Sequence, residues 1–161
     1  MENDQRVRTD GNIRNKTKGS IAYSVKHDFS GKLAKESTYP PKIEDDQPGV
    51  FNHEETSGEK TGSCGAVVYR GKNKNGKDCD WMFSWSNPNP IHKENKVFTA
   101  IAEGGYYPAD TQDPIWHDVH KELMKSGTTS TSEWNGCISS MTSTPDDVNN
   151  CVDVKGTASL A

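Results

Sequence analysis

The sequence has 161 residues, a formal net charge of −4 and a hydrophobic content of 30%. This length suits a single domain with one core. The mildly acidic charge argues against nucleic acid as the main partner, because nucleic-acid binding relies on clustered Lys and Arg. No apolar run reaches the roughly 18 residues of a membrane-spanning helix, and no apolar stretch resembles a secretory signal. We therefore expect a cytoplasmic protein without a transmembrane segment.

The N-terminal segment is strongly polar. Residues 1–18 hold only three apolar side chains larger than alanine, Met1, Val7 and Ile13. Burying so few groups does not offset the entropy lost on ordering the segment, so we expect a flexible N-terminal arm. The Asn-Lys-Thr tripeptide at Asn15 matches a glycosylation signal that is used only in secreted proteins and often occurs by chance.

The first predicted strand covers residues 19–29. Ile21, Tyr23 and Val25 alternate there with smaller or polar residues, which is the period of a half-buried strand. The segment that follows is rich in proline, so only short extended pieces fit between its turns.

The clearest signal is a β-hairpin. Residues 63–71 (SCGAVVYRG) and residues 78–86 (DCDWMFSWS) are predicted strands, and Asn75-Gly76 lies in the turn between them. Alternate positions of the second strand place four large side chains on one face, Cys79, Trp81, Phe83 and Trp85. Because each buried aromatic ring contributes roughly 2–3 kcal/mol, we assign Trp81 and Phe83 to the core and leave Trp85, at the strand end, open.

After a predicted strand over residues 96–104, the period changes to that of a helix. Asp113 stands at the N-cap position, Pro114 at the first helical position and Gly127 just past the end. The helical spacing is carried by Ile115, Val119 and Leu123. Together these signals predict one short helix, around 114–125.

The last third of the chain predicts a further strand over residues 132–143 and a loose tail over residues 144–161. One domain over residues 19–143 remains. Several strands, long polar loops and one helix predict a mostly β fold, an antiparallel β-sandwich with a short helix packed against it.

Four cysteines are present, and their positions are Cys64, Cys79, Cys137 and Cys151. No two form a CxxC pair and none adjoins a histidine, so local spacing does not indicate a structural zinc site. Four cysteines allow three full disulfide pairings, and the sequence does not choose among them. Buried reduced thiols are the interpretation that we favour.

Evidence for catalysis is weak. His117 and His120 lie three residues apart on the predicted helix, as a metal site would require, but the polar face of an amphipathic helix has the same appearance. No GxSxG, P-loop or GxGxxG motif occurs, so we expect no enzyme and no cofactor. Tyr106, Tyr107 and Trp116 lie in or just after a Gly/Pro loop and suit contacts with a lipid headgroup or a sugar.

Several segments resemble the plant jasmonate-induced protein family of stress-responsive proteins. They include GSCGAVVYRGKNKNGKDCDWMFSWSNP, NKVFTAI and SEWNGC, and the resemblance covers residues 19–142. Family members have a longer N-terminal region, so the resemblance implies that this chain is shortened there.

The domain of that family is similar to mushroom lectin-like proteins that recognise sphingomyelin with cholesterol, which in turn resemble the actinoporin β-sandwich. This resemblance implies a phosphocholine pocket with Ser86 and Pro88 in a turn and Trp116 and His120 on the helix. His120 and Lys121 stand where the toxins have two tyrosines, which departs from the phosphocholine pattern. The polar N-terminus lacks an amphipathic pore helix, so we do not expect pore formation.

These observations predict a non-enzymatic, stress-associated protein that binds a lipid headgroup or a glycan, with peripheral membrane contact. The predicted ligand-binding residues are Ser86, Pro88, Tyr106, Tyr107, Trp116 and His120. Two alternatives remain, a metal-dependent or redox activity at His117 and His120, and a protein-interaction module in defence signalling.

Overall fold

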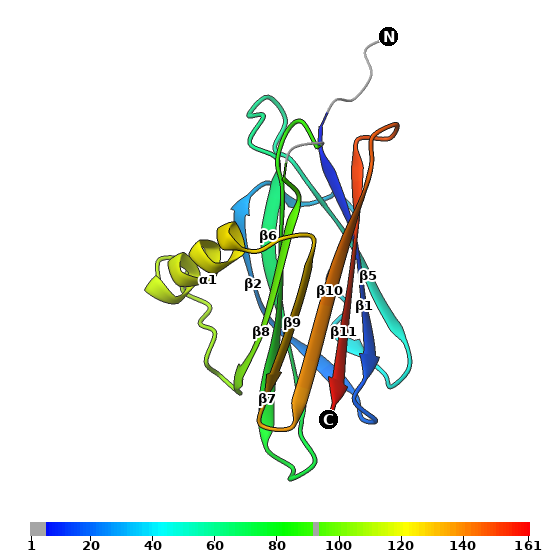
Figure 1. Ribbon diagram of the computed structural model, residues 1–161, viewed down its shortest axis with the longest axis vertical. Coiled ribbons are helices and arrows are strands. Elements are labelled where there is room, and N and C mark those ends of the chain that lie inside the picture. Colours follow the sequence, from blue (N-terminus) through cyan, green and yellow to red (C-terminus); the bar gives the residue numbers. More distant parts are fainter. Residues whose placement is uncertain (1–5, 92–93) are drawn as a thin grey trace.

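Two β-sheets pack face to face in the computed structural model, which describes residues 6–91 and 94–161, and one helix lies on an outer face (Figure 1). The strands are β1 (Arg8–Lys16), β2 (Ile21–Ser30), β3 (Lys32–Leu33), β4 (Lys42–Ile43), β5 (Pro48–Glu54), β6 (Ser63–Lys72), β7 (Asp78–Asn87), β8 (Lys96–Glu103), β9 (Thr129–Trp134), β10 (Cys137–Asp146) and β11 (Cys151–Leu160). One sheet has the order β3-β5-β1-β11-β10-β9 and the other β4-β2-β6-β7-β8. Only β1 and β11 run parallel among the strand pairs of the described residues. The predicted β-sandwich is confirmed.

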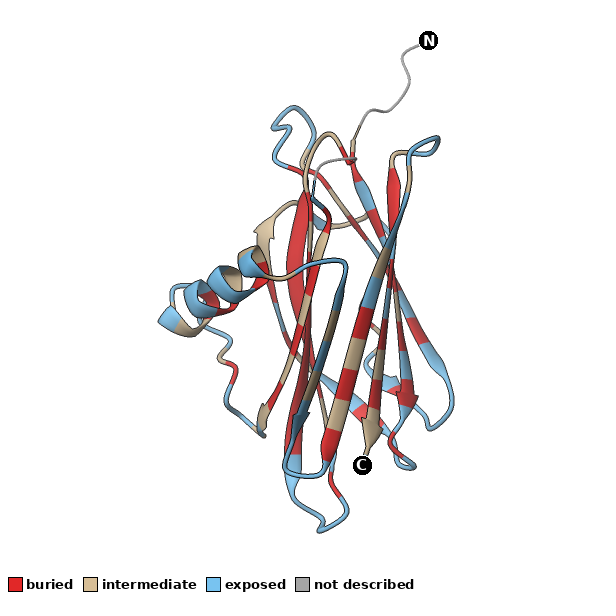
Figure 2. Cartoon of the chain, in the orientation of Figure 1, coloured by how far each residue is buried: buried red, intermediate tan, exposed pale blue. Residues whose placement is uncertain are grey.

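The helix α1 (Pro114–Lys125) has the predicted bounds. The Asp113 side chain accepts a hydrogen bond from the backbone N–H of Ile115 at 2.9 Å, which caps the first turn. Val119 and Leu123 face the sheet, and the opposite side of the helix is exposed (Figure 2). Within the described residues, no helix has both the length and the hydrophobicity needed to cross a bilayer.

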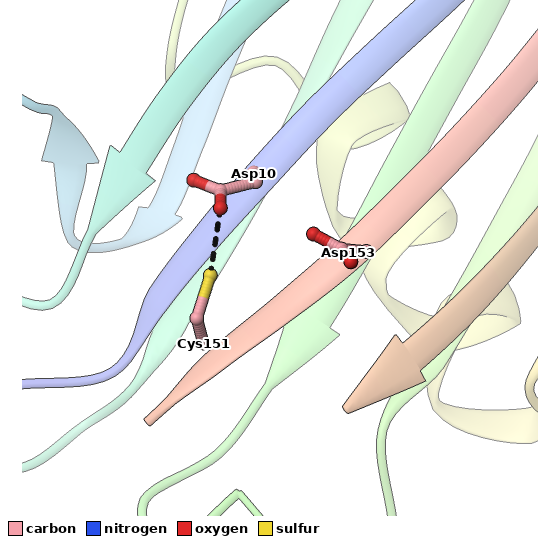
Figure 3. Close-up of side chains that lie close together, drawn as sticks. All are labelled: Asp10, Cys151 and Asp153. Atoms are coloured by element: carbon pink, nitrogen blue, oxygen red, sulfur yellow. Dashed lines mark hydrogen bonds between the residues drawn. The ribbon is translucent and has the colours of Figure 1, made fainter. Parts of the chain in front are cut away.

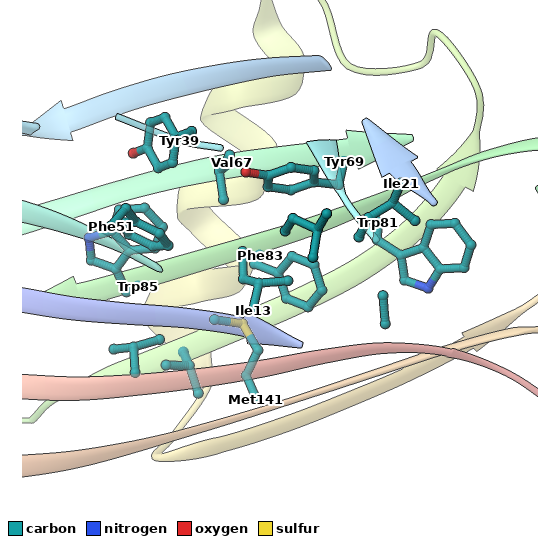
Figure 4. Packing of buried hydrophobic residues seen from close by; sticks show 14 of the residues in the cluster. Ile13, Ile21, Tyr39, Phe51, Val67, Tyr69, Trp81, Phe83, Trp85 and Met141 are labelled. Atoms are coloured by element: carbon teal, nitrogen blue, oxygen red, sulfur yellow. The ribbon is translucent and has the colours of Figure 1, made fainter. Parts of the chain in front are cut away.

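The core between the sheets is built around the predicted face of β7. Trp81, Phe83 and Trp85 are all 0% exposed, which confirms the first two as core residues and decides the third. Figure 4 shows these rings between the sheets, with Ile13 and Met141 reaching them from the opposite side. The other face of β7 is buried as well, because α1 and its neighbouring loop cover it.

The expectation of a flexible N-terminal arm over residues 1–18 is wrong for the described part. Residues Arg8–Lys16 form β1, which lies between β5 and β11 in the middle of its sheet. Small or polar inward residues suffice there because a neighbouring ring fills the space. A Cβ added at Gly11 would lie 2.1 Å from the ring of Phe51. Counting large apolar side chains misses such a strand.

The C-terminal tail expected over residues 144–161 is also wrong. β10 continues to Asp146, and β11 pairs with β10 on one side and β1 on the other. Glycine again makes room for an aromatic residue, since a Cβ at Gly156 would lie 2.8 Å from the Phe83 ring.

The single strand expected over residues 132–143 is a hairpin. β9 ends at Trp134 and β10 begins at Cys137. Asn135 and Gly136 between them have positive φ angles of 52° and 80°, as a tight two-residue turn requires. The Asn135-Gly136 pair is a sequence signal for this turn that the single-strand prediction overlooked.

The glycosylation tripeptide at Asn15 is enclosed. Asn15 is 0% exposed. Its Nδ2 donates to the carbonyl oxygens of Gly19 at 2.7 Å and Ile43 at 2.9 Å, and its Oδ1 accepts from the backbone N–H of Thr17. The nitrogen that would carry a glycan therefore holds the β1–β2 turn in place.

A register shift in β2 decides which residues face the helix. The pairing of β2 with β6 shifts between Tyr23 and Val25. Ile21, before the shift, packs in the core between the sheets, whereas Val25, after it, packs under α1. Strict alternation places Ile21, Val25 and His27 on one face of the strand. Because of the shift, Val25 and His27 face the helix instead.

Candidate functional site

A cavity of about 370 Å³ lies beside the N-terminal half of α1. It is lined by His27 and Phe29 of β2, by Thr111, Gln112 and Asp113 of the preceding loop, and by Pro114, Trp116, His117 and His120 of α1. Aromatic rings and polar groups alternate around it. A pocket of this size and composition suits a small ligand with both apolar and polar parts.

Trp116 forms the floor of the cavity. Its side chain is only 2% exposed. The ring stacks on His27 with centroids 4.8 Å apart and an interplanar angle of 10°, and Tyr107 lies 5.8 Å away on a tilted plane. The indole Nε1 donates to the carbonyl oxygen of Pro108 at 3.1 Å. Trp116 is therefore fixed by neighbours and shapes the site.

One wall of the cavity is formed by Phe29 and the imidazoles of His27 and His120. The Phe29 ring meets His27 edge-on at 4.6 Å and His120 at 5.0 Å between centroids. Burial lowers the pKa of His27, and although Asp28 raises it somewhat, Lys26 adds to the lowering. The His27 ring is therefore neutral at neutral pH.

The structure separates the predicted ligand-binding residues. Trp116 and His120 line the cavity, whereas Ser86 and Pro88, at and just beyond the end of β7, do not. Tyr107 is buried, 7% exposed, while Tyr106 is 53% exposed on the loop before the helix.

Two lining residues, His27 and Phe29, were missed by sequence reasoning. Both lie in the VKHDF stretch of the first predicted strand. Alternation alone groups them with Ile21, on the core side, and only the register shift places them beside the helix. Nothing local in the sequence marks that shift.

The loop that carries Tyr106 and Tyr107 is held by a buried carboxylate. Asp80 is 0% exposed and accepts hydrogen bonds from Arg70 Nε at 2.8 Å and Nη2 at 3.2 Å. It also accepts from the backbone N–H of Gly105 at 2.9 Å. The carboxylate thus ties the loop to the sheet.

We expect Asp80→Ala to lower the free energy of unfolding by about 2–3 kcal/mol, because it removes the acceptor of two Arg70 hydrogen bonds and of the Gly105 N–H. Urea denaturation measures this loss, and hydrogen exchange should show faster exchange at Gly105. Asp78→Ala is the matched control on the same strand, since its ion pair with Lys72 is exposed and screened by solvent and should contribute little to stability. Equal losses in the two variants would contradict the assigned role.

A Ser–His–Asp arrangement occurs elsewhere in the fold. The His53 ring, 0% exposed, lies 3.0 Å from Asp28 Oδ1 through Nε2 and 2.7 Å from Ser63 Oγ through Nδ1. The Ser63 and Thr9 hydroxyls are hydrogen-bonded at 2.7 Å, and Asn87 Nδ2 donates to Thr9 Oγ1 at 2.7 Å. Ser63 is fully enclosed. The chain of polar groups therefore joins the two sheets and does not present a nucleophile at the surface.

Three potential metal-binding groups meet on the outer face of the six-stranded sheet (Figure 3). The donor atoms of Asp10, Cys151 and Asp153 lie within 4.8 Å of one another. The Cys151 thiol donates to Asp10 Oδ2 at 3.0 Å, and burial together with this carboxylate raises its pKa to about 12. The thiol is therefore protonated, whereas metal binding uses a thiolate.

The geometry gives little support to a metal-dependent or redox activity at His117 and His120. Among the described residues, this group of three is the one whose potential metal ligands all lie within 4.8 Å of one another, and it includes neither His117 nor His120. All four cysteines are buried and unpaired, so none of the disulfide pairings left open by the sequence is formed.

Comparison with known proteins gives consistent matches. The family model described as Nakanori-like protein matches residues 3–155. The 23 kDa jasmonate-induced protein of Hordeum vulgare is 33% identical over 124 residues, which cover 76% of this chain and 56% of that protein. A jasmonate-induced protein homolog of Atriplex canescens is 36% identical over 103 residues, which cover 63% of this chain and 54% of that protein. The chain thus spans little more than half the length of these relatives.

Solved structures share the fold. The crystal structure of the lipid binding protein Nakanori superposes with a TM-score of 0.76 at 21% identity, covering 94% of this chain and 70% of that one. The RahU protein, in complex with a TRIS molecule, gives a TM-score of 0.55 at 8% identity, covering 96% of each chain. At these identities the likeness concerns the fold alone. With the family match extending over nearly the whole sequence, and the resemblance to jasmonate-induced proteins confirmed, the chain belongs to the Nakanori-like protein family.

Proposed function

We propose that this protein is a non-enzymatic, stress-associated protein that binds a lipid headgroup in the cavity beside α1. The observation that carries the proposal is the cavity itself, about 370 Å³ with aromatic and polar walls. The jasmonate-induced relatives support the link to stress, and the name of the Nakanori structure supports a lipid as ligand. The four free cysteines are consistent with a cytoplasmic location.

The headgroup would contact Phe29 and His120 in the wall of the cavity and would make less contact with Trp116 at its floor. Trp116 is covered by His27 and Tyr107, so a choline-like cation would approach Phe29 and His120 instead. Contact of a cation with an exposed aromatic face contributes about 0.5–1 kcal/mol. Tyr106 is exposed on the loop before the helix and suits the interface between lipid and water. The proposal does not require Ser86 or Pro88.

Vesicle co-sedimentation tests the proposal. We expect the wild type to be retained on sphingomyelin/sterol or phosphatidylcholine vesicles, and the Phe29→Ala/His120→Ala double variant to bind about 5- to 30-fold more weakly, because it removes two rings of the wall. Val50→Ala is the control, since Val50 is 61% exposed on β5 of the other sheet. Circular dichroism confirms that each variant is folded. Absence of wild-type retention, or equal retention of the double variant, would refute the site.

A further inference from the structure

Another cavity, of about 480 Å³, lies at the end of the sandwich that carries the β6–β7 and β9–β10 turns (Figure 1). It is bounded by the beginning of β7, the end of β8 and the end of β9. The lining residues are Lys77, Asp78, Glu103, Gly104, Trp134 and Asn135. Among the described residues, none lines both this cavity and the one beside α1, so the two sites are separate.

Trp134 places an accessible indole ring at this cavity. The three other tryptophans of the chain are at most 2% exposed, whereas Trp134 is 42% exposed. A single exposed apolar residue is common on protein surfaces and by itself indicates no function. Here the ring borders a hollow that also contains charged and amide groups. An aromatic side chain beside a few convergent polar groups is typical of a small-ligand site.

The two turns beside this cavity are held together by the buried side chain of Asn73. Asn73 is 6% exposed, and its Nδ2 donates to the carbonyl oxygen of Asn135 at 3.1 Å. Its Oδ1 accepts from the backbone N–H groups of Asn75 at 2.9 Å and Lys77 at 3.0 Å. The β9–β10 turn is therefore fixed relative to the β6–β7 turn. A ligand would not have to order these turns, which lowers the entropic cost of binding.

The opposite side of the cavity is closely packed. The backbone N–H of Gly104 donates to the carbonyl oxygen of Asp78 at 3.0 Å. A Cβ added at Gly104 would lie only 2.7 Å from the Cβ of Asp78. The end of β8 and the beginning of β7 thus stay close together, and the carboxylates of Asp78 and Glu103 border the same hollow.

The charges around this cavity favour a neutral ligand. Asp78 and Glu103 are balanced by Lys77, which also lines the cavity, and by Lys72, which pairs with Asp78 at 2.6 Å. An ion of either sign would therefore meet a like charge. The carboxylates accept hydrogen bonds, the ammonium groups donate them, and the Asn135 amide does both. Such a mixture suits a molecule with several hydroxyl groups, each of which donates and accepts.

We propose that this cavity binds a neutral saccharide. The apolar face of a sugar ring packs against the indole of Trp134, and its hydroxyl groups bond to the Glu103 carboxylate and the Asn135 amide. The site goes beyond the proposed lipid function and does not rest on it. A soluble oligosaccharide and the sugar of a glycolipid present the same ring, so both sources are tested.

A glycan array probed with the full chain tests the class of ligand. The neutral arm holds oligosaccharides of glucose, galactose, mannose and xylose. Sialylated and sulfated oligosaccharides form the anionic arm, and glucosamine oligomers form the cationic arm. We expect retention on neutral glycans and weaker retention on both charged arms. Absence of binding to the neutral arm, or preference for a charged arm, would overturn the proposal.

Calorimetric titration with the neutral oligosaccharide that gives the strongest array signal tests the residues. Trp134→Ala should bind it about 2- to 10-fold more weakly, and Trp134→Phe, which keeps a ring, should recover part of the affinity. Glu103→Ala should bind about 10-fold more weakly, because it removes a charged acceptor. Phe29→Ala/His120→Ala, which alters the other cavity, is the control and should bind as the wild type does. Equal affinity of wild type and Trp134→Ala, with both folded by circular dichroism, would refute the site.

Tryptophan fluorescence provides a readout confined to this cavity. Acrylamide should quench Trp134 preferentially, because the other tryptophans are enclosed. The same oligosaccharide at saturation should shield the ring and lower the quenching constant of the wild type, but not that of Trp134→Phe. Unchanged quenching of the wild type would place the saccharide elsewhere and contradict the proposal.

Vesicle co-sedimentation separates this inference from the proposed function. If the wild type binds neutral oligosaccharides but is not retained on sphingomyelin/sterol or phosphatidylcholine vesicles, the lipid proposal fails and the saccharide site stands. Added retention on phosphatidylcholine vesicles that contain glucosylceramide, if lost in Trp134→Ala, would identify a glycolipid as the source of the sugar. Weaker retention of Trp134→Ala on plain phosphatidylcholine vesicles, with unchanged saccharide binding, would assign the ring to membrane contact and refute the saccharide site.

Discussion

Gly11→Val is expected to lower the free energy of unfolding by about 3–4 kcal/mol, which is large for a substitution by an apolar residue. A Cβ at this position would lie 2.1 Å, 2.3 Å and 2.5 Å from three atoms of the Phe51 ring. That ring is itself enclosed, because it packs against Tyr39 and Trp85 with centroids 4.9 Å and 5.0 Å away. Either Phe51 leaves its place or β1 moves away from β5. Urea denaturation monitored by tryptophan fluorescence measures the loss.

Gly19→Val provides the matched control. A Cβ at Gly19 meets nothing within 4 Å, so this variant should change stability by no more than about 0.5 kcal/mol. A double-mutant cycle sharpens the test. Phe51→Ala removes the ring that the introduced valine side chain would strike, so Gly11→Val and Phe51→Ala together should cost at least about 1 kcal/mol less than the sum of their separate effects. Additive losses would mean that the ring is not the obstacle.

The second large effect is expected at the buried polar chain. His53→Ala should lower the free energy of unfolding by about 3–4 kcal/mol, because it opens a cavity and removes one buried hydrogen bond each from Asp28 and Ser63. Chemical denaturation measures the change. His117→Ala, on the exposed side of α1, should change stability by no more than about 0.5 kcal/mol. Similar effects in the two variants would contradict a structural role for His53.

The hydrogen bond between Asp28 and His53 also predicts how the free energy of unfolding depends on pH at the acidic end. Burial raises the pKa of Asp28, but hydrogen bonds from His53 and Lys26 outweigh this and hold the pKa below its usual value. A carboxylate with a lowered folded pKa contributes stability above its unfolded pKa of about 3.9 and loses it as the pH falls through the folded value. In His53→Ala the part of this acid-dependent loss that arises from Asp28 should shrink.

Local signals predicted the elements that local chemistry decides. Asn75-Gly76 between two alternating strands gave the β6–β7 hairpin, and Asp113 with Pro114 gave the start of α1. The missed strands, β1 and β11, depend on complementarity across the sandwich. Their inward positions include Gly11 and Gly156, whose space is filled by the rings of Phe51 and Phe83. No window of the sequence contains both a glycine and the ring that it accommodates.

The candidate site was predicted only in part, because one side of it is formed by a strand far from the helix in the sequence. Trp116 and His120 lie on the helix that the sequence identified, and both line the cavity. His27 reaches it only because a register shift in β2 turns the strand over. Ser86 was expected to belong to the pocket, but the cavity is lined on that side by His27 and Phe29 of β2 instead.

The parallel pairing of β1 with β11 has a consequence for the order of folding. Arg8 pairs with Cys151 and Lys16 with Ser159, so the first and last strands of the described chain meet in the middle of the six-stranded sheet. During synthesis, the edge of β1 that pairs with β11 would stay without its hydrogen-bonding partner until β11 has left the ribosome. Contacts between such distant residues form slowly. Formation of the complete six-stranded sheet is therefore expected to follow the synthesis of β11.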